Sequence, residues 1–171
     1  MYLILAAPAL GNVQLSTTPR LAPSFRPVAT DYVSRCRAGH LLRVHVQASD
    51  GDRLAVGGHL ERGGTFTTSV NRGTGQSVTV KVRSPKGTVT RYYIRCLPRG
   101  FPDWTIRRHG APQAQWYVAA PVTGSGGYVA IFDAYGAPVW WRHIAPSSPR
   151  CPRRSASWES ACSHRRRSGA A

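Results

Sequence analysis

Six histidines and four cysteines are the residues of this chain best suited to metal binding or nucleophilic chemistry. The histidines are His40, His45, His59, His109, His143 and His164. No two of them have a metal-binding spacing such as His-Glu-x-x-His, and no Ser-His-Asp set can be nominated from position alone. Cys151, Cys162 and His164 could supply three metal ligands, but a structural zinc site needs a fourth. The sequence therefore predicts no catalytic, cofactor-binding or metal site.

The other two cysteines follow one local pattern. Cys36 ends the segment Tyr-Val-Ser-Arg-Cys and Cys96 ends Tyr-Tyr-Ile-Arg-Cys, so each closes an alternating run typical of a β-strand. We expect Cys36 and Cys96 to lie within disulfide reach, with Cα atoms about 4.4–6.8 Å apart. The alternative is a pair of buried free thiols. Because disulfides persist in oxidising compartments, a bridge here would favour an exported protein, secreted or at the cell surface.

The chain has 23 basic and 7 acidic residues and a formal net charge of +16. Residues 145–171 hold six arginines and one glutamate and contribute +5, so residues 1–144 contribute +11. In that larger part the charges are scattered along polar strand faces, which favours a solvated surface. The alternative is a site that binds a polyanion such as nucleic acid or an anionic glycan. No apolar run reaches the roughly 18 residues of a membrane span.

Short alternating segments separated by Gly and Pro turns fill the region from Val13 to Leu97. Strands are expected there at 42–48, 53–56, 65–70, 77–83 and 88–96. Their spacing of about 8–12 residues is typical of an antiparallel β-sandwich. The 17 glycines and 13 prolines argue against a helical bundle. We therefore predict an all-β fold with a small antiparallel β-sandwich domain over residues 13–97.

The sequence changes character on either side of this domain. Residues 98–112 are expected to form an extended connector pinned by Phe101 and Trp104, and three further strands are expected after it. These strands cover 115–120, 128–133 and 138–142. Residues 1–12 are apolar and are interpreted as a signal-peptide remnant, the alternative being a first strand or a loose arm.

Residues 145–171 have neither the period of a strand nor that of a helix. They are rich in Ser, Arg, Ala and Pro, and we interpret them as a disordered basic tail produced by a frameshift or truncation. The alternative is a genuine disordered tail that binds nucleic acid or anionic surfaces through its arginines.

The segment from Tyr92 to Trp141 resembles bacterial arylsulfotransferase-like proteins of the actinobacterial type. The matching motifs, in order, are YYIRCLP at 92–98, FPDWT at 101–105, GAPQA at 110–114, WY at 116–117 and IFDAYGAPVWW at 131–141. DYVSRC at 31–36 resembles the start of the same family's N-terminal β domain. The resemblance implies a small β-sandwich followed by a β-propeller that binds an aryl sulfate. A histidine of that propeller accepts the sulfuryl group and passes it to a phenol.

The resemblance also implies that residues 113–144 are a single, incomplete propeller blade. One blade needs about 40–50 residues, and 74 residues follow Leu97. The chain is thus expected to be an inactive N-terminal fragment of an exported arylsulfotransferase-like protein, with aryl sulfate and phenol as substrates of the full-length parent only. His143 would end a blade strand and not accept sulfuryl groups, and Trp140 and Trp141 would be exposed. The alternatives are a non-enzymatic cell-surface β-sandwich module that binds anionic polymers and a basic-tail nucleic-acid binder.

Overall fold

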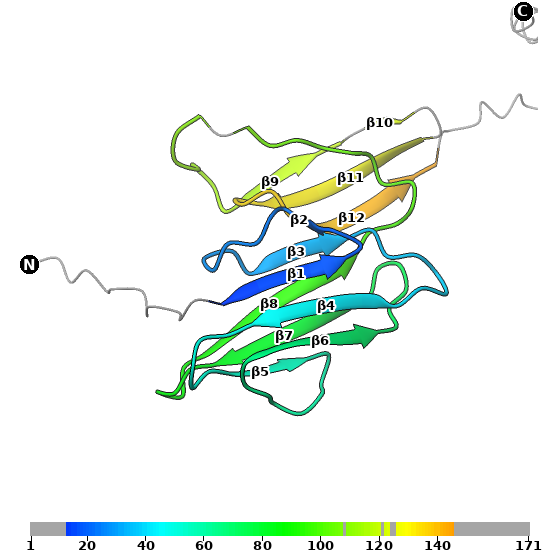
Figure 1. Ribbon diagram of the computed structural model, residues 1–171. Coiled ribbons are helices and arrows are strands. Elements are labelled where there is room, and N and C mark those ends of the chain that lie inside the picture. Colours follow the sequence, from blue (N-terminus) through cyan, green and yellow to red (C-terminus); the bar gives the residue numbers. More distant parts are fainter. Residues whose placement is uncertain (1–12, 108, 121, 124–125, 146–171) are drawn as a thin grey trace, which may run out of the picture.

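The structure is a computed structural model that describes residues 13–107, 109–120, 122–123 and 126–145. Within these ranges the chain forms twelve β-strands and no helix, which confirms the all-β prediction. The strands form three sheets, here called sheets A, B and C (Figure 1). The described ranges accordingly contain no helix long and apolar enough to cross a bilayer. The predictions made for residues 1–12, for 146–171 and for Cys151, Cys162 and His164 lie outside the described residues.

Sheet A has three antiparallel strands in the order β1-β4-β6. They are β1 (Gln14–Thr18), β4 (Leu42–Gln47) and β6 (Thr65–Val70). Strand β4 is half-buried, as its alternating apolar and polar residues predict: buried and exposed residues alternate along it. Leu42, Val44 and Val46 are buried, while the polar residues between them face solvent.

Sheet B has five strands in the order β2-β3-β8-β7-β5. They are β2 (Leu21–Ala22), β3 (Asp31–Ser34), β5 (Arg53–Val56), β7 (Ser77–Arg83) and β8 (Val89–Cys96). The other pairs of this sheet are antiparallel, as predicted for the sandwich. Strands β3 and β8 are the exception: they run parallel, with Ser34 opposite Cys96. Parallel neighbours need a long crossover, and here the four strands β4 to β7 supply it.

Sheets A and B enclose one hydrophobic core. Its largest fully buried side chains include Tyr32, Tyr92, Leu54 and Ile94. The two tyrosines reach polar partners at the core's edge: the hydroxyl of Tyr32 donates to the carbonyl of Arg26 at 2.6 Å. Burying side chains of this size contributes roughly 1.5–3 kcal/mol each, so this core holds the sandwich together.

Sheet C has four strands, with β11 (Gly126–Asp133) at its centre. Strand β12 (Pro138–Ile144) pairs with one side of β11, while β9 (Trp116–Ala119) and β10 (Val122–Thr123) pair with the other side. In Figure 1 sheet C lies above the sandwich, next to β3. A four-stranded sheet thus follows the sandwich and the connector.

A second hydrophobic core joins sheet C to sheet B. Val33 points into this core, with Leu97, Phe101, Tyr128 and Phe132. Its neighbour Tyr32 points the opposite way, into the sandwich core. Strand β3 is therefore buried on both faces, which a strand of a two-layer sandwich is not.

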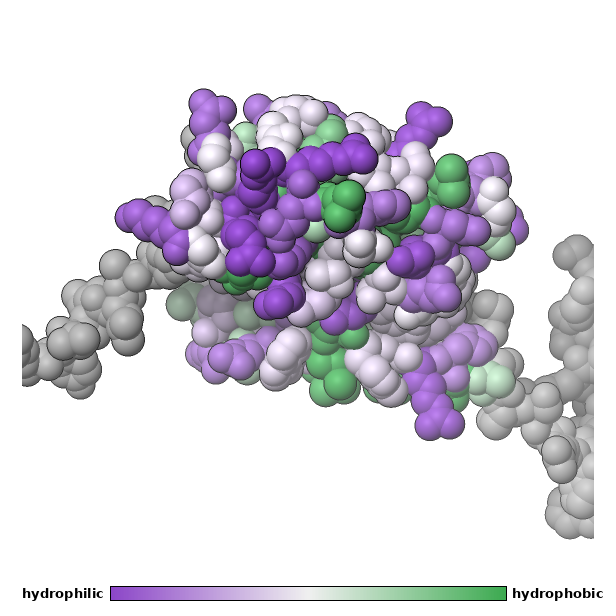
Figure 2. All heavy atoms as spheres, turned by 90° about the horizontal axis from the view of Figure 1, so that it is seen from below, coloured by the Kyte–Doolittle hydropathy of each residue, from purple (hydrophilic) through white to green (hydrophobic). Residues whose placement is uncertain are grey.

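The face drawn in Figure 2 carries hydrophilic side chains over most of its area, with small hydrophobic patches between them. Such a distribution is expected of solvated charge spread along polar strand faces.

Candidate functional site

Sheet C has one open face and one face that is covered over β11, although the residues of β9 are exposed on both faces. The side chains of Tyr128, Ala130 and Phe132 on β11 are 7%, 0% and 8% exposed and pack into the second core. The ring of Phe101 lies 5.0 Å from that of Tyr128 and 5.9 Å from that of Trp141. The connector therefore covers the inner face of the sheet with aromatic side chains.

The opposite side of sheet C, called the outer face below, is mostly apolar, and most of its large side chains are exposed. Ile131 lies at its centre, paired with Val118 on β9 and with Trp140 on β12. Directly paired residues of neighbouring strands lie on the same face of a sheet. Val118 is 73% exposed and Trp140 is 47% exposed. The outer face comprises the apolar residues Trp116, Val118, Val129, Ile131, Trp140 and Ile144, together with one exposed arginine, Arg142, which pairs with Val129.

Trp140 and Trp141 differ in their surroundings. Trp140 is exposed as predicted, but the prediction is wrong for Trp141, which is half-buried and packs against the second core. The reason is the alternation of side chains along a strand, which turns adjacent residues to opposite faces. The sequence pattern could have shown that only one of the two tryptophans would lie on an open face.

Three hydrogen bonds hold the β11–β12 hairpin in place. The side chain of Asp133 accepts hydrogen bonds from the backbone amides of Tyr135 at 2.9 Å and Ala137 at 2.7 Å. The indole nitrogen of Trp104 donates to the carbonyl of Gly136 at 2.9 Å. Phe101 is only 3% exposed, so Phe101 and Trp104 pin the connector as expected.

Burial raises the pKa of the Asp133 carboxyl above its ordinary value, although the hydrogen bonds from the backbone amides act in the opposite direction.

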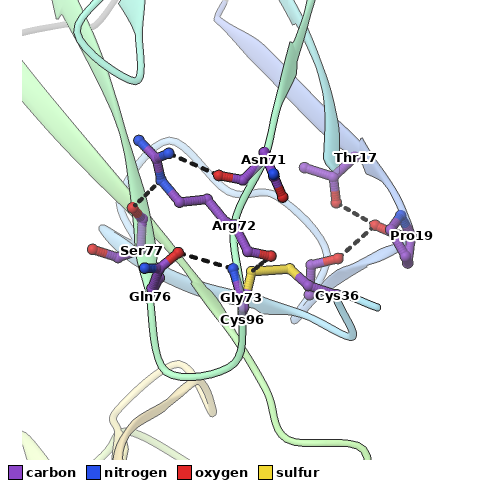
Figure 3. Close-up of a disulfide and its surroundings, with 10 residues drawn as sticks. Thr17, Pro19, Cys36, Asn71, Arg72, Gly73, Gln76, Ser77 and Cys96 are labelled. Atoms are coloured by element: carbon purple, nitrogen blue, oxygen red, sulfur yellow. Dashed lines mark hydrogen bonds between the residues drawn. A yellow bond between two sulfur atoms is a disulfide. The ribbon is translucent and has the colours of Figure 1, made fainter. Parts of the chain in front are cut away.

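Cys36 and Cys96 form the predicted disulfide, with Cα atoms 5.2 Å apart (Figure 3). Cys96 is the last residue of β8, and Cys36 lies just beyond β3. The backbone carbonyl of Ser34 accepts hydrogen bonds from the amides of both Cys36 and Leu97. The bridge therefore fastens the parallel strands β3 and β8 at their shared end.

The described histidines do not assemble a reactive site. The ring of His143 packs edge-on at 4.9 Å against Tyr128 at the inner side of sheet C, and His45 lies on the exposed side of β4, with its Nδ1 3.0 Å from the hydroxyl of Thr67. His40 lines a cleft beside the sandwich. No group of three or more His, Cys, Asp or Glu side chains among the described residues could hold a metal ion.

Comparisons with known proteins add no relative: no family model, no curated protein and no solved structure matches this chain.

Proposed function

We propose that this chain is the N-terminal β module of an exported arylsulfotransferase-like protein. In this proposal the module supports the next β-sheet of that protein and does not transfer sulfuryl groups itself. The observation that carries the proposal is the apolar outer face of sheet C, whose tryptophan, valine and isoleucine side chains are about half exposed or more at four positions. Contiguous exposed apolar patches mark interaction surfaces.

A second sheet is the occupant that this surface fits best. Sheets pack face to face about 10 Å apart with interdigitating apolar side chains. Val118, Ile131 and Trp140 form one cross-strand row over three neighbouring strands, which is the kind of surface that such packing buries. The motif series from 92 to 141 supports the same arrangement, since in the family that it resembles blades follow one another.

The described residues offer little for sulfuryl transfer. That reaction needs a nucleophile surrounded by several donors that converge on the transferring group. His143 lies at the exposed end of β12 and packs against one tyrosine ring. Aryl sulfate and phenol are therefore proposed as substrates of the full-length parent only. The disulfide supports the proposed export, because such bonds persist outside reducing compartments.

The activity half of the proposal is tested by incubating the purified chain with a chromogenic aryl sulfate and phenol. We expect no transfer above the uncatalysed rate. Turnover that disappears in His143→Ala would contradict the proposal, because it would place a working nucleophile in this chain.

The surface half is tested with the neutral dye Nile red, which fluoresces when bound to apolar surface. The double variant Val118→Lys/Trp140→Lys should lose dye binding while keeping its melting temperature, since both side chains are already exposed. The control pair is Thr67→Lys/Ser69→Lys on the exposed side of β6, which should leave dye binding unchanged. Dye binding that is absent from the unmodified chain, or equal in both variants, would contradict the proposed sheet-packing role.

The coding DNA provides a test of ancestry. Beyond the codon for Ala145, another reading frame should encode repeated Asp-x-x-Gly…Trp hairpins like that at 133–140. Early stop codons in every alternative frame would rule out the interpretation of residues 145–171 as the product of a frameshift.

A further inference from the structure

A wide cleft of about 1910 Å³ lies beside the sandwich, between the loops around β2 and β3 and the connector. This volume exceeds the roughly 300–1,000 Å³ of a typical small-molecule pocket. Its walls come from segments far apart in sequence: the β1–β2 and β2–β3 loops, the segment after Cys36, and residues 97–106. A ligand of several linked units fits its size better than a single small molecule does.

The described lining of the cleft is strongly basic. Six arginines line it: Arg20, Arg26, Arg35, Arg37, Arg43 and Arg99. Among the described residues, Asp103 is the single acidic residue in the lining, and it is paired with Arg35 at 2.6 Å. The other five arginines have no ion pair with any acidic residue in the described part of the chain. The cleft thus gathers uncompensated positive charge between low-dielectric walls, which concentrates anions.

Arg35 shows that this charge is built into the fold. Besides its pairing with Asp103, its guanidinium donates to the backbone carbonyls of Phe101 at 2.8 Å and Pro102 at 3.1 Å. These contacts tie the end of β3 to the connector. They fix the two walls of the cleft relative to each other, so the remaining arginines face a preformed space.

The cleft also has an apolar lining. Leu41 is 55% exposed and Ile106 is 45% exposed, and both contribute to the cleft together with the half-buried Trp104. Apolar and aromatic surface between arginines suits a ligand whose anionic groups sit on rings with apolar faces. Guanidinium groups match the planar or tetrahedral oxygens of carboxylate and sulfate through paired hydrogen bonds.

We infer that this cleft binds an anionic glycan, a linear polysaccharide that carries sulfate or carboxylate groups. The disulfide favours a glycan over a nucleic acid, because Cys36 itself lines the cleft and such bonds persist where cell-surface polysaccharides are found. The inference does not depend on the proposed function, since the cleft and the outer face of sheet C are built from different residues.

The test uses two charge-matched triple variants of the full chain. The cleft variant is Arg20→Gln/Arg37→Gln/Arg99→Gln, and the control is Arg53→Gln/Arg62→Gln/Arg91→Gln, whose side chains are exposed and do not line the cleft. Each removes three positive charges. Both are also prepared with the six arginines of 145–171 replaced by Gln, so that binding by that segment cannot mask the effect. Circular dichroism melts confirm that each variant is folded.

Binding of a heparin oligosaccharide is measured by isothermal titration calorimetry at fixed ionic strength. We expect the cleft variant to bind about tenfold more weakly and the control to change less than about twofold, since each lost contact to an exposed charge weakens binding by up to about fivefold. Equal weakening in the two variants, in both backgrounds, would overturn the inference in favour of diffuse attraction. Single-stranded DNA of equal charge that binds as tightly, with the same dependence on the cleft arginines, would overturn the glycan assignment.

Discussion

Removing the bridge between Cys36 and Cys96 is the perturbation whose size the structure defines best. The bond joins the ends of β3 and β8, and the chain between them forms strands of both sandwich sheets. In the unfolded chain the bond restricts a loop with a sequence separation of 60. Chain entropy for a loop of that length corresponds to about 4 kcal/mol at 25 °C.

We therefore expect Cys36→Ala/Cys96→Ala to lower the free energy of unfolding by about 4 kcal/mol. For a chain of this size that corresponds to a fall of roughly 8–16 °C in melting temperature. With a urea dependence of about 2 kcal/mol per molar, the unfolding midpoint would fall by about 2 M.

The assay is urea unfolding followed by tryptophan fluorescence, in a Cys151→Ser/Cys162→Ser background that leaves Cys36 and Cys96 as the remaining cysteines. Reduced wild-type protein provides the matched control, because it keeps both sulfur atoms and lacks only the covalent bond. A loss below about 1.5 kcal/mol in the reduced protein would refute the reasoning, because the expected entropic effect is more than twice as large. A large loss in the alanine variant alone would assign the effect to packing.

Three further predictions concern single buried groups. Burial raises the pKa of Asp133 above its ordinary value of about 4, so the protonated carboxyl stabilises the fold at low pH and this stability is lost as pH rises through the raised pKa. Asp133→Asn should reduce this loss above about pH 4, as measured by urea unfolding at a series of pH values. Burial raises the pKa of Tyr32 to about 12 and also raises that of Tyr92, so the late phenolate signal in an alkaline absorbance titration should become smaller in Tyr32→Phe. Stability should fall between about pH 10 and pH 12. Gly136 has a φ of 93° and the side chain of Ile106 against it, so Gly136→Ala should cost about 2 kcal/mol. Gly58→Ala, with a φ of 88° and open space around it, should cost less in the same thermal melts.

Local sequence patterns were enough to predict several strands of the sandwich. The ranges 53–56, 65–70 and 77–83 agree with β5, β6 and β7. In β7 the alternation of apolar and polar residues matches the burial pattern, whereas β5 and β6 are delimited by the glycine turns beside them. Strands β1 and β2 were not predicted as separate elements. β2 has two residues, and β1 has the sequence QLSTT, so both depend on pairing with partners more than on their own pattern.

Long-range placement was beyond the sequence pattern. The parallel pairing of β3 with β8 depends on how the four intervening strands cross between two sheets. The arginine cleft was missed for the same reason, since Arg20, Arg37 and Arg99 lie in three separate segments. A scan for clustered basic residues finds nothing there, although the fold brings the three side chains to one cleft.

Strand β3 links the sandwich, the cleft and sheet C. Its alternation sends Tyr32 into the first core and Val33 into the second, while Arg35, just beyond its end, ties the connector to the cleft wall. The disulfide at Cys36 then fixes that end against β8. Sheet C is thus held to the sandwich in two ways: by the buried side chains of the second core, which include Val33, and by the connector, to which Arg35 is hydrogen-bonded. The outer face of sheet C and the arginine cleft are therefore presented in a fixed relation to each other, so that an anionic glycan bound in the cleft would lie at a defined distance from whatever packs on sheet C.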